Sequence, residues 1–211
     1  MISIPWFLAG GVAWSASEYV IHRFVGHGPK RKPKETLIER LTPSGLAAEF
    51  NREHLAHHAD PTYFAPTTRK LAGAASAIPA IALALTPFAG PRRAASFALG
   101  YAAVYATYEV LHRRIHTHPP TGPYGRWMRH HHLYHHHKTP RENHGVTSPV
   151  WDYLFGTESE REKVRVPRKA APQWMVDPST GEVAAPYAED YELVPRRAAQ
   201  VATATPASEL S

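Results

Sequence analysis

The chain has 211 residues, a length that suits one domain and a tail. It contains no cysteine, which excludes disulfides, thiolate zinc fingers, cysteine-ligated iron–sulfur clusters and cysteine nucleophiles. The formal net charge is +6, and the basic side chains lie beside apolar runs, as at residues 30–34 and 69–70. No known nucleic-acid-binding motif accompanies them. We therefore expect contacts with a membrane surface and no nucleic-acid partner.

Three stretches are rich in apolar or small residues. Residues 1–17 carry no charged side chain, residues 71–90 give twenty uncharged positions, and residues 94–111 contain only Glu109. A membrane-crossing helix needs about 20 such residues and tolerates roughly 17, so the second run qualifies and the others are marginal. Residues 91–93 alone separate the last two runs, which predicts a helical hairpin. Pro79 and Pro87 predict a kink or an early end in its first helix.

Buried helices of a soluble all-α protein are the alternative interpretation of these runs. The small residues that dominate the hairpin favour close helix packing in lipid instead. The first run lacks the basic start of a signal peptide, so we expect it to be retained. The basic flanks predict that residues 23–70 and everything after residue 112 lie in the cytosol.

The fold class that follows is all-α, a membrane-embedded helical bundle with a cytosolic, histidine-rich helical cap. Residues 112–160 are polar and rich in histidine. From about Arg165 the chain is rich in proline, alanine and charge, without a steady period. We predict one membrane-embedded domain over residues 1–160 and a flexible polar tail over residues 161–211.

Many of the 15 histidines fall into four clusters. His22 and His27 are five residues apart, and the glycines and proline over residues 26–29 predict a helix end there, so that both can bend toward one point. The other clusters have spacings of i, i+4 or i, i+3, i+4, which place their members on one helix face. These clusters are His54, His57 and His58; His112 and His116; and His132, His135 and His136.

Metal binding explains the four clusters together. Neutral imidazole is the commonest protein ligand for zinc, iron and copper. One helical pair alone indicates little, but four clusters without metal would crowd cations or desolvated imidazoles at one membrane face. An affinity tag over residues 130–137 would not be internal and interrupted, and a metal-storage loop would lack helical spacing. Ten ring nitrogens suffice for two ions with five ligands each, and ligand type alone does not choose between zinc and iron.

The cluster pattern resembles that of the fatty acid hydroxylase/sterol desaturase superfamily of membrane di-iron oxygenases, and is most similar to its fatty acid 2-hydroxylase branch. The boxes are H-x4-H, H-x2-H-H, H-x3-H and H-x2-H-H. The resemblance covers roughly residues 15–157. Flanking matches are Glu18 and Tyr19 before His22, Tyr108 and Glu109 before His112, and, after His136, residues 143–148, 151–152 and 155–157.

The resemblance implies that the ten clustered histidines are metal ligands. They are His22, His27, His54, His57, His58, His112, His116, His132, His135 and His136. His131 and His137 could displace a neighbour by one place, whereas the remaining three, His118, His130 and His144, have no family role. Carboxylates could hold the imidazole tautomers, although each could equally be an ordinary helix-end or surface charge. The candidates are Glu18, Glu53, Asp60, Glu109 and Asp152.

The resemblance also implies an oxidoreductase that uses two iron ions and dioxygen to hydroxylate a lipid acyl chain, with zinc possible in isolated protein. A desaturase, a sterol or carotenoid oxygenase of the same superfamily, and a non-redox zinc-binding membrane protein are the alternatives. The haem motif of a fused cytochrome b5 domain is absent from this sequence, so we expect a separate electron donor, either cytochrome b5-like or a ferredoxin with its reductase. We expect an integral protein of the bacterial inner membrane or endoplasmic reticulum, with its metal site on the cytosolic face.

Overall fold

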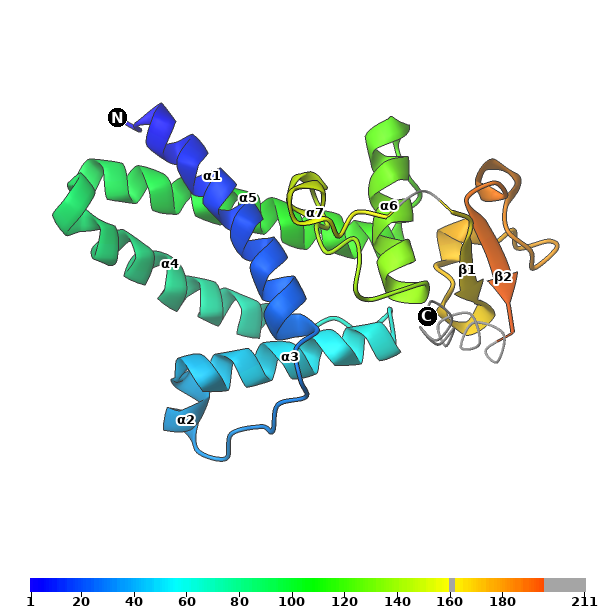
Figure 1. Ribbon diagram of the computed structural model, residues 1–211, viewed down its shortest axis with the longest axis horizontal. Helices are drawn as coiled ribbons and strands as arrows, with labels where there is room; N and C mark the ends of the chain where they lie inside the picture. Colours follow the sequence, from blue (N-terminus) through cyan, green and yellow to red (C-terminus); the bar gives the residue numbers. More distant parts are fainter. Residues whose placement is uncertain (160–161, 196–211) are drawn as a thin grey trace, which may run out of the picture. The chain divides into compact units, whose positions relative to one another are not determined.

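The computed structural model describes residues 1–159 and 162–195. The helical elements are α1 (Ile4–Val20), the π-helical turn η1 (Ile21–Gly26), α2 (Leu37–Leu41), α3 (Pro43–Ala59), α4 (Thr67–Ala89), α5 (Pro91–Thr117), α6 (Gly122–His137) and α7 (Val150–Phe155) (Figure 1). They are followed by strand β1 (Val164–Pro167), the 3-10 turns η2 (Arg168–Ala170), η3 (Gln173–Met175) and η4 (Ala185–Tyr187), and strand β2 (Tyr191–Val194). The protein is mostly helical, as the sequence predicted, and the two short strands are an addition to the all-α fold class.

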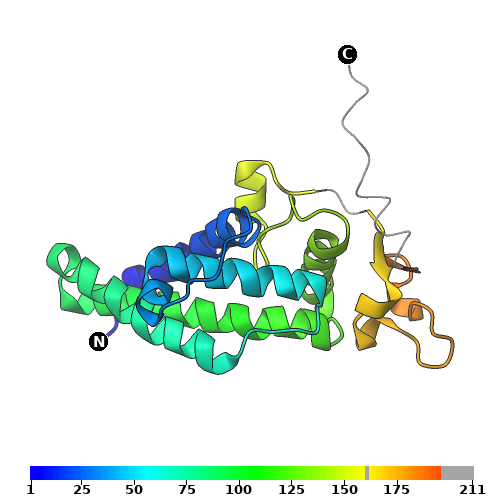
Figure 2. The same cartoon turned by 90° about the horizontal axis from the view of Figure 1, so that it is seen from below.

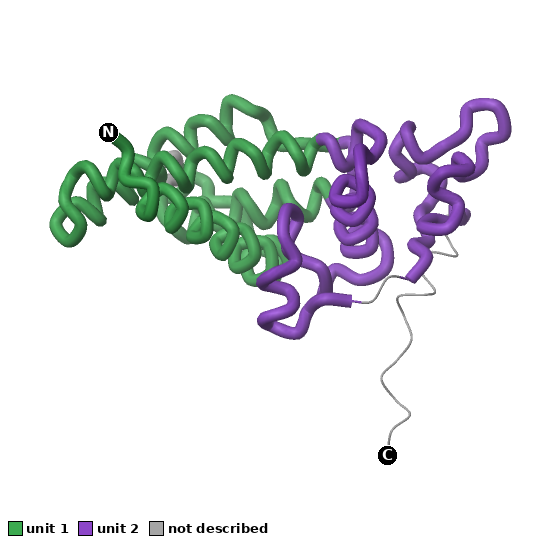
Figure 3. The backbone as a smooth tube through the Cα atoms, turned by 90° about the horizontal axis from the view of Figure 1, so that it is seen from above, with its two compact units in different colours: residues 1–57, 63–113 green, residues 58–62, 114–211 purple. Residues whose placement is uncertain are grey.

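The chain forms two compact units (Figure 3). Unit 1 comprises residues 1–57 and 63–113, and unit 2 comprises residues 58–62 and 114–211. The boundary falls inside α3 and inside α5, and neither helix is broken at that point. Both helices therefore carry histidines that belong to unit 1 and histidines that belong to unit 2.

In unit 1, helix α1 crosses α5 at very close range (Figure 1). A Cβ atom at Gly10 would stand 2.0 Å from the backbone oxygen of Phe97. One at Gly100 would stand 1.9 Å from the backbone oxygen of Phe7. Any larger residue at either position would push the two backbones apart, so these glycines set the distance between α1 and α5.

Helix α4 forms a hairpin with α5, as the sequence predicted (Figure 2). The two helices are joined through Gly90, which has a φ of 77°. Over the described residues, α4 is the one helix long and apolar enough to cross a membrane, by length and composition, and none of its residues is buried. It continues through Pro79 and Pro87, so the early end considered for this helix does not occur.

In unit 2, the segment after α7 folds against α6. Strand β1 pairs with β2 in parallel, with Val164 opposite Tyr191. A buried apolar cluster joins this ladder to α6, and its members are Leu133, Tyr134, Val164, Val166, Met175 and Tyr191. The expected flexible tail therefore does not describe residues 162–195, because widely separated apolar residues meet there in a small core. The rest of that tail, residues 196–211, lies outside the described residues.

Candidate metal centre

His22 and His27 are brought together in unit 1 by a π-helical turn. Helix α1 runs directly into η1, where the amide of His27 donates to the carbonyl of His22 over 3.1 Å. This i→i+5 bond belongs to a wider turn than that of an α-helix, so residues five apart lie above one another. The sequence predicted a helix end between these histidines. The helix widens first and then ends at Gly26, just before His27.

Asn51 ties this turn to α3. Its side chain is buried, and its amide group donates to the carbonyls of Val25 and Gly26, each over 2.9 Å. Its Oδ1 atom accepts a bond from the amide of Arg31 over 3.2 Å. Because His54 follows Asn51 by three residues on α3, the same contacts bring His54 next to η1. Sequence analysis missed Asn51, since its partners are 25 and 26 residues away and no local spacing marks them.

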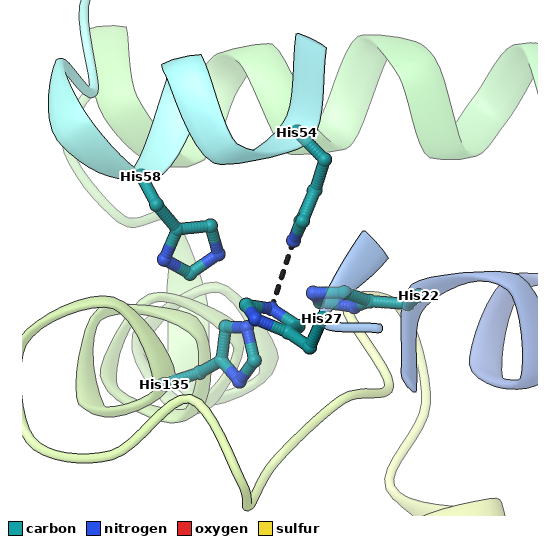
Figure 4. A group of neighbouring side chains, drawn as sticks. All are labelled: His22, His27, His54, His58 and His135. Carbon is teal, nitrogen blue, oxygen red and sulfur yellow. Dashed lines mark hydrogen bonds between the residues drawn. The ribbon is translucent and has the colours of Figure 1, made fainter. Parts of the chain in front are cut away.

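His22, His27 and His54 form one compact group within unit 1. The Nε2 atoms of His27 and His54 lie 2.8 Å apart, the dashed line in Figure 4. One ring nitrogen of each of the three lies within 4.8 Å of the others. Figure 4 also draws His58 and His135, which belong to unit 2.

His57 and His112 form a second close pair in unit 1. Both are buried, and their Nε2 atoms are 3.1 Å apart. The Nδ1 atom of His57 lies 2.7 Å from the carbonyl oxygen of Tyr63, so a proton on Nδ1 leaves Nε2 free to bind a metal. Tyr108 stacks on His112 with ring centroids 5.5 Å apart, which restrains the second imidazole.

Three further histidines, carried by α5 and α6, form a group in unit 2. The Nε2 atoms of His116 and His132 are 3.1 Å apart. A ring nitrogen of His136 lies within 4.8 Å of both. His116 and His132 are buried, and the structure places them on helices as their spacing predicted.

His58 and His135 are also neighbours in unit 2, with ring centroids 4.9 Å apart. The Nδ1 atom of His135 lies 2.7 Å from the carbonyl oxygen of Glu142. As at His57, a proton on Nδ1 leaves the lone pair of Nε2 free to bind a metal. The ring of His58 stacks on that of His136 at 4.0 Å, so all five clustered histidines of this unit lie in one continuous group.

The nitrogen separations fit metal coordination. Two imidazole nitrogens bound to one zinc or iron ion at about 2.1 Å each, with an angle near 90–109°, lie about 3.0–3.4 Å apart. The pairs His57–His112 and His116–His132 both have 3.1 Å, and the pair His27–His54 is slightly closer. An all-imidazole set suits either zinc or iron, and these residues could hold such an ion.

Asp152, one of the carboxylate candidates, is fully buried and lies beside two histidines. It accepts bonds from the amides of His144 and Gly145 over 2.8 and 2.7 Å and from Oγ1 of Thr157 over 2.8 Å. The Nε2 atom of His131 lies 3.4 Å away. Burial alone would raise the pKa of Asp152, but the hydrogen bonds of His131, His144, Gly145 and Thr157 outweigh it and hold that pKa well below its usual value.

The histidines outside the clusters have other surroundings. His118 is exposed, as a residue without a metal role would be. His130 is buried and bonds through Nε2 to the carbonyl of Glu162 over 2.8 Å. Burial lowers the pKa of His137 to about 4. His131 and His144 both lie beside the carboxylate of Asp152, and the ring centroid of His144 is 5.4 Å from that of His135.

Unit 1 contains a largely apolar cavity of about 510 Å³. Its apolar walls come from α1, α4 and α5, with Trp14, Ala77 and Tyr101 among the lining residues. Four of the clustered histidines also line it, namely His22, His54, His57 and His112. The cavity therefore places apolar walls beside four of the clustered histidines of unit 1.

Ion pairs surround part of this cavity and involve two of the carboxylate candidates. Glu53 pairs with Arg69 over 2.6 Å, and Glu109 pairs with Lys70 over 2.5 Å. These bonds tie the start of α4 to α3 and to α5. The other two candidates differ, because Glu18 is a buried lining residue whereas Asp60 accepts a bond from its near neighbour Thr62 in an exposed turn.

Several helices of this protein carry closely spaced imidazoles, and these side chains could hold metal ions. The chain belongs to the fatty acid hydroxylase family, which it matches over residues 7–157. This match confirms the resemblance that the histidine boxes and their flanks indicated. It includes all ten clustered histidines and ends before the β-ladder of unit 2.

Similar proteins carry related descriptions. Two dihydroceramide fatty acyl 2-hydroxylases of Arabidopsis thaliana are 32% and 29% identical over 73% and 70% of this chain. The ceramide very long chain fatty acid hydroxylase scs7 of Schizosaccharomyces pombe is 29% identical over 74% of this chain. The chain spans 60%, 58% and 43% of the lengths of these three relatives.

One solved structure has a similar fold. It is described as full-length scs7p with only its hydroxylase domain visible, and it is 25% identical with a TM-score of 0.55. The similarity covers 74% of this chain and 55% of the other. The helical scaffold is therefore shared with a hydroxylase domain.

Proposed function

We propose that the ten clustered histidines hold two metal ions in two sets of five. Helical spacing supports ligand pairs on single helices, because His54 and His58 lie at i, i+4 on α3, and His112 and His116 lie at i, i+4 on α5. Unit 1 would contribute His22, His27, His54, His57 and His112. Unit 2 would contribute His58, His116, His132, His135 and His136.

Iron is the metal that we propose for both positions, with dioxygen as co-substrate. Bound iron supplies the oxygen activation that attack on an unactivated C–H bond requires. The contribution of the chain is to fix the ligands. The carbonyls of Tyr63 and Glu142 hold protons on Nδ1 of His57 and His135, and Tyr108 restrains the ring of His112. These contacts keep the metal-binding nitrogens in place before an ion arrives.

The proposed substrate is the acyl chain of a lipid, and the proposed reaction is its hydroxylation. The cavity of unit 1 supports this, since apolar walls suit hydrocarbon and the lining histidines would bring a metal to it. Trp14 presents a large apolar surface there, and its ring meets those of Tyr101 and Tyr105 with centroids 5.2 and 4.7 Å apart. The names of the relatives favour a ceramide-like lipid and attack at carbon 2.

A membrane setting follows from the same proposal. Helix α4 would cross the bilayer, and the clustered histidines would lie at the cytosolic face of a bacterial inner membrane or endoplasmic reticulum. The cavity wall formed by α4 would then separate lipid from the site. Reduction of the metal ions would require a separate electron-donor protein, either cytochrome b5-like or a ferredoxin with its reductase.

The observation that carries the proposal is the placement of paired imidazoles about 3.1 Å apart beside an apolar cavity. The test is metal analysis of protein purified under reducing conditions from iron-supplied cells, with oxygen uptake measured in the presence of lipid. We expect two iron ions per chain and a lipid product heavier by one oxygen atom. Zinc alone, with no oxygen consumed with any lipid, would leave a non-redox zinc protein and contradict the proposal.

A further inference from the structure

The end of helix α5 lacks two of its own hydrogen-bond donors. In an α-helix the carbonyl of residue i accepts a bond from the amide of residue i+4. For Ile115 and His116 the residues at i+4 are Pro119 and Pro120, which have no amide hydrogen. Ile115 is fully buried, so its carbonyl needs a donor from elsewhere in the fold.

Trp174 supplies that donor. Its indole Nε1 donates to the carbonyl of Ile115 over 2.9 Å. Trp174 belongs to η3, between the two strands, and packs against the buried cluster of the ladder. Tyr187 and Tyr191 hold its ring, with centroids 5.1 and 6.0 Å away. A residue 59 positions along the chain thus completes the helix that carries His116.

Arg129 connects the same end of α5 to α6. Its guanidinium donates to the carbonyls of Arg114 and Gly125 over 3.0 Å each and to that of His118 over 2.9 Å. It is 3% exposed, and it lies over the ring of Trp174 at 5.8 Å. Each of its three nitrogen atoms bonds to a different carbonyl, whereas lysine would offer its donors from a single nitrogen atom.

These contacts are made on α5 and α6 close to one pair of proposed ligands. His116 precedes the prolines on α5, and His132 follows Arg129 by three residues on α6. Their Nε2 atoms are 3.1 Å apart. The ladder also holds α6 directly, through the cluster at Leu133 and Tyr134. The segment of residues 162–195 therefore supports both helices at the point where these two imidazoles meet.

We propose that Arg129 and Trp174 are positioning residues for the His116–His132 pair, and that residues 162–195 are part of the support of the metal centre. The family match ends at residue 157, so residues 162–195, and Trp174 with them, lie outside the matched region. The inference rests on the proposed function in one respect, that His116 and His132 bind the same ion. His22, His27 and His54 belong to unit 1 and Trp174 belongs to unit 2, so we expect the ion that these three histidines bind to be independent of Trp174.

The test is titration of the metal-free protein with cobalt(II), whose visible absorption reports imidazole coordination. We expect two ions to bind the unaltered chain. In Trp174→Phe, which keeps the ring and removes the N–H, the affinity for one ion should fall about 10-fold, and in Arg129→Lys it should fall about 10- to 100-fold. The other ion should bind as before. Trp6→Phe, which alters an indole on α1, is the matched control and should change neither affinity.

A second measurement separates positioning from general stability. In the metal-free protein, amide hydrogen exchange over residues 114–118 should quicken in Trp174→Phe, while exchange in α1 and α3 stays unchanged. Equal affinities for both ions in wild type and Trp174→Phe would overturn the inference, as would equal weakening of both. Loss of the helical circular dichroism would make Trp174 a folding residue and overturn it too. If the unaltered chain bound no cobalt, the proposed function itself would fail.

Discussion

Replacing Asn51 by alanine tests how His27 is held next to His54. The variant removes the donors to the carbonyls of Val25 and Gly26. A buried acceptor left without its donor costs about 1–3 kcal/mol, and this applies to Gly26, because the carbonyl of Val25 also accepts from the amide of Gly28 over 3.4 Å. Movement of η1 would relieve part of this cost. That movement should separate His27 from His54, whose Nε2 atoms are now 2.8 Å apart.

We therefore expect Asn51→Ala to lower metal affinity about 10- to 100-fold for one ion, as loss of a supporting contact typically does. Cobalt(II) titration and the thermal midpoint in detergent are the measurements. Asn51→Asp, which keeps the acceptor for Arg31 and loses the donors, should behave similarly. Ser44→Ala, at the exposed start of α3, is the control. Unchanged affinity for both ions in Asn51→Ala would refute the role assigned to Asn51.

Three further experiments probe other parts of the site. His57→Ala should abolish loading of one ion and all oxygen uptake, whereas His118→Ala, at an exposed position, should retain most of both; metal and activity retained in His57→Ala would contradict the ligand assignment. Because the pKa of Asp152 is depressed, its contribution to the free energy of unfolding is present above the unfolded pKa, near 3.8, and is lost as pH falls further. Asp152→Asn should thus lower the thermal midpoint at pH 7 and flatten its fall in acid; identical pH profiles would oppose this. Ala77→Phe should fill the cavity, raise KM or abolish turnover and leave both ions bound, as measured by lipid kinetics and metal analysis; unchanged kinetics would remove the cavity from the substrate path.

Local spacing predicted the elements that depend on local structure. The i, i+3 and i+4 spacings located the clusters of α3, α5 and α6, because one helical turn decides which residues share a face. The apolar runs likewise predicted the α4–α5 hairpin. What the spacing did not give was the π-helical turn, since i→i+5 bonds leave no periodic signal in six residues.

Contacts between distant residues escaped prediction for a different reason. Asn51 bonds to η1, and Trp174 bonds to α5, across 25 or more residues. The residue types asparagine and tryptophan do not by themselves mark such contacts. The ladder was missed because Val164 pairs with Tyr191 across a stretch rich in proline and charge. Such pairings depend on tertiary packing, and composition alone favoured a flexible tail. The domain boundary at residue 160 stays a prediction.

The first and third histidine boxes reach a similar result by different backbones. His112 and His116 use an ordinary α-helical turn, while His22 and His27 need the wider turn of η1, which contains one residue more. Removing a single codon between His22 and His27 would convert the first spacing into the third. A single-residue deletion therefore separates the two boxes. One geometry could change into the other by mutation while both histidines are retained. The two boxes differ in the number of residues between their histidines and not in the ligands themselves.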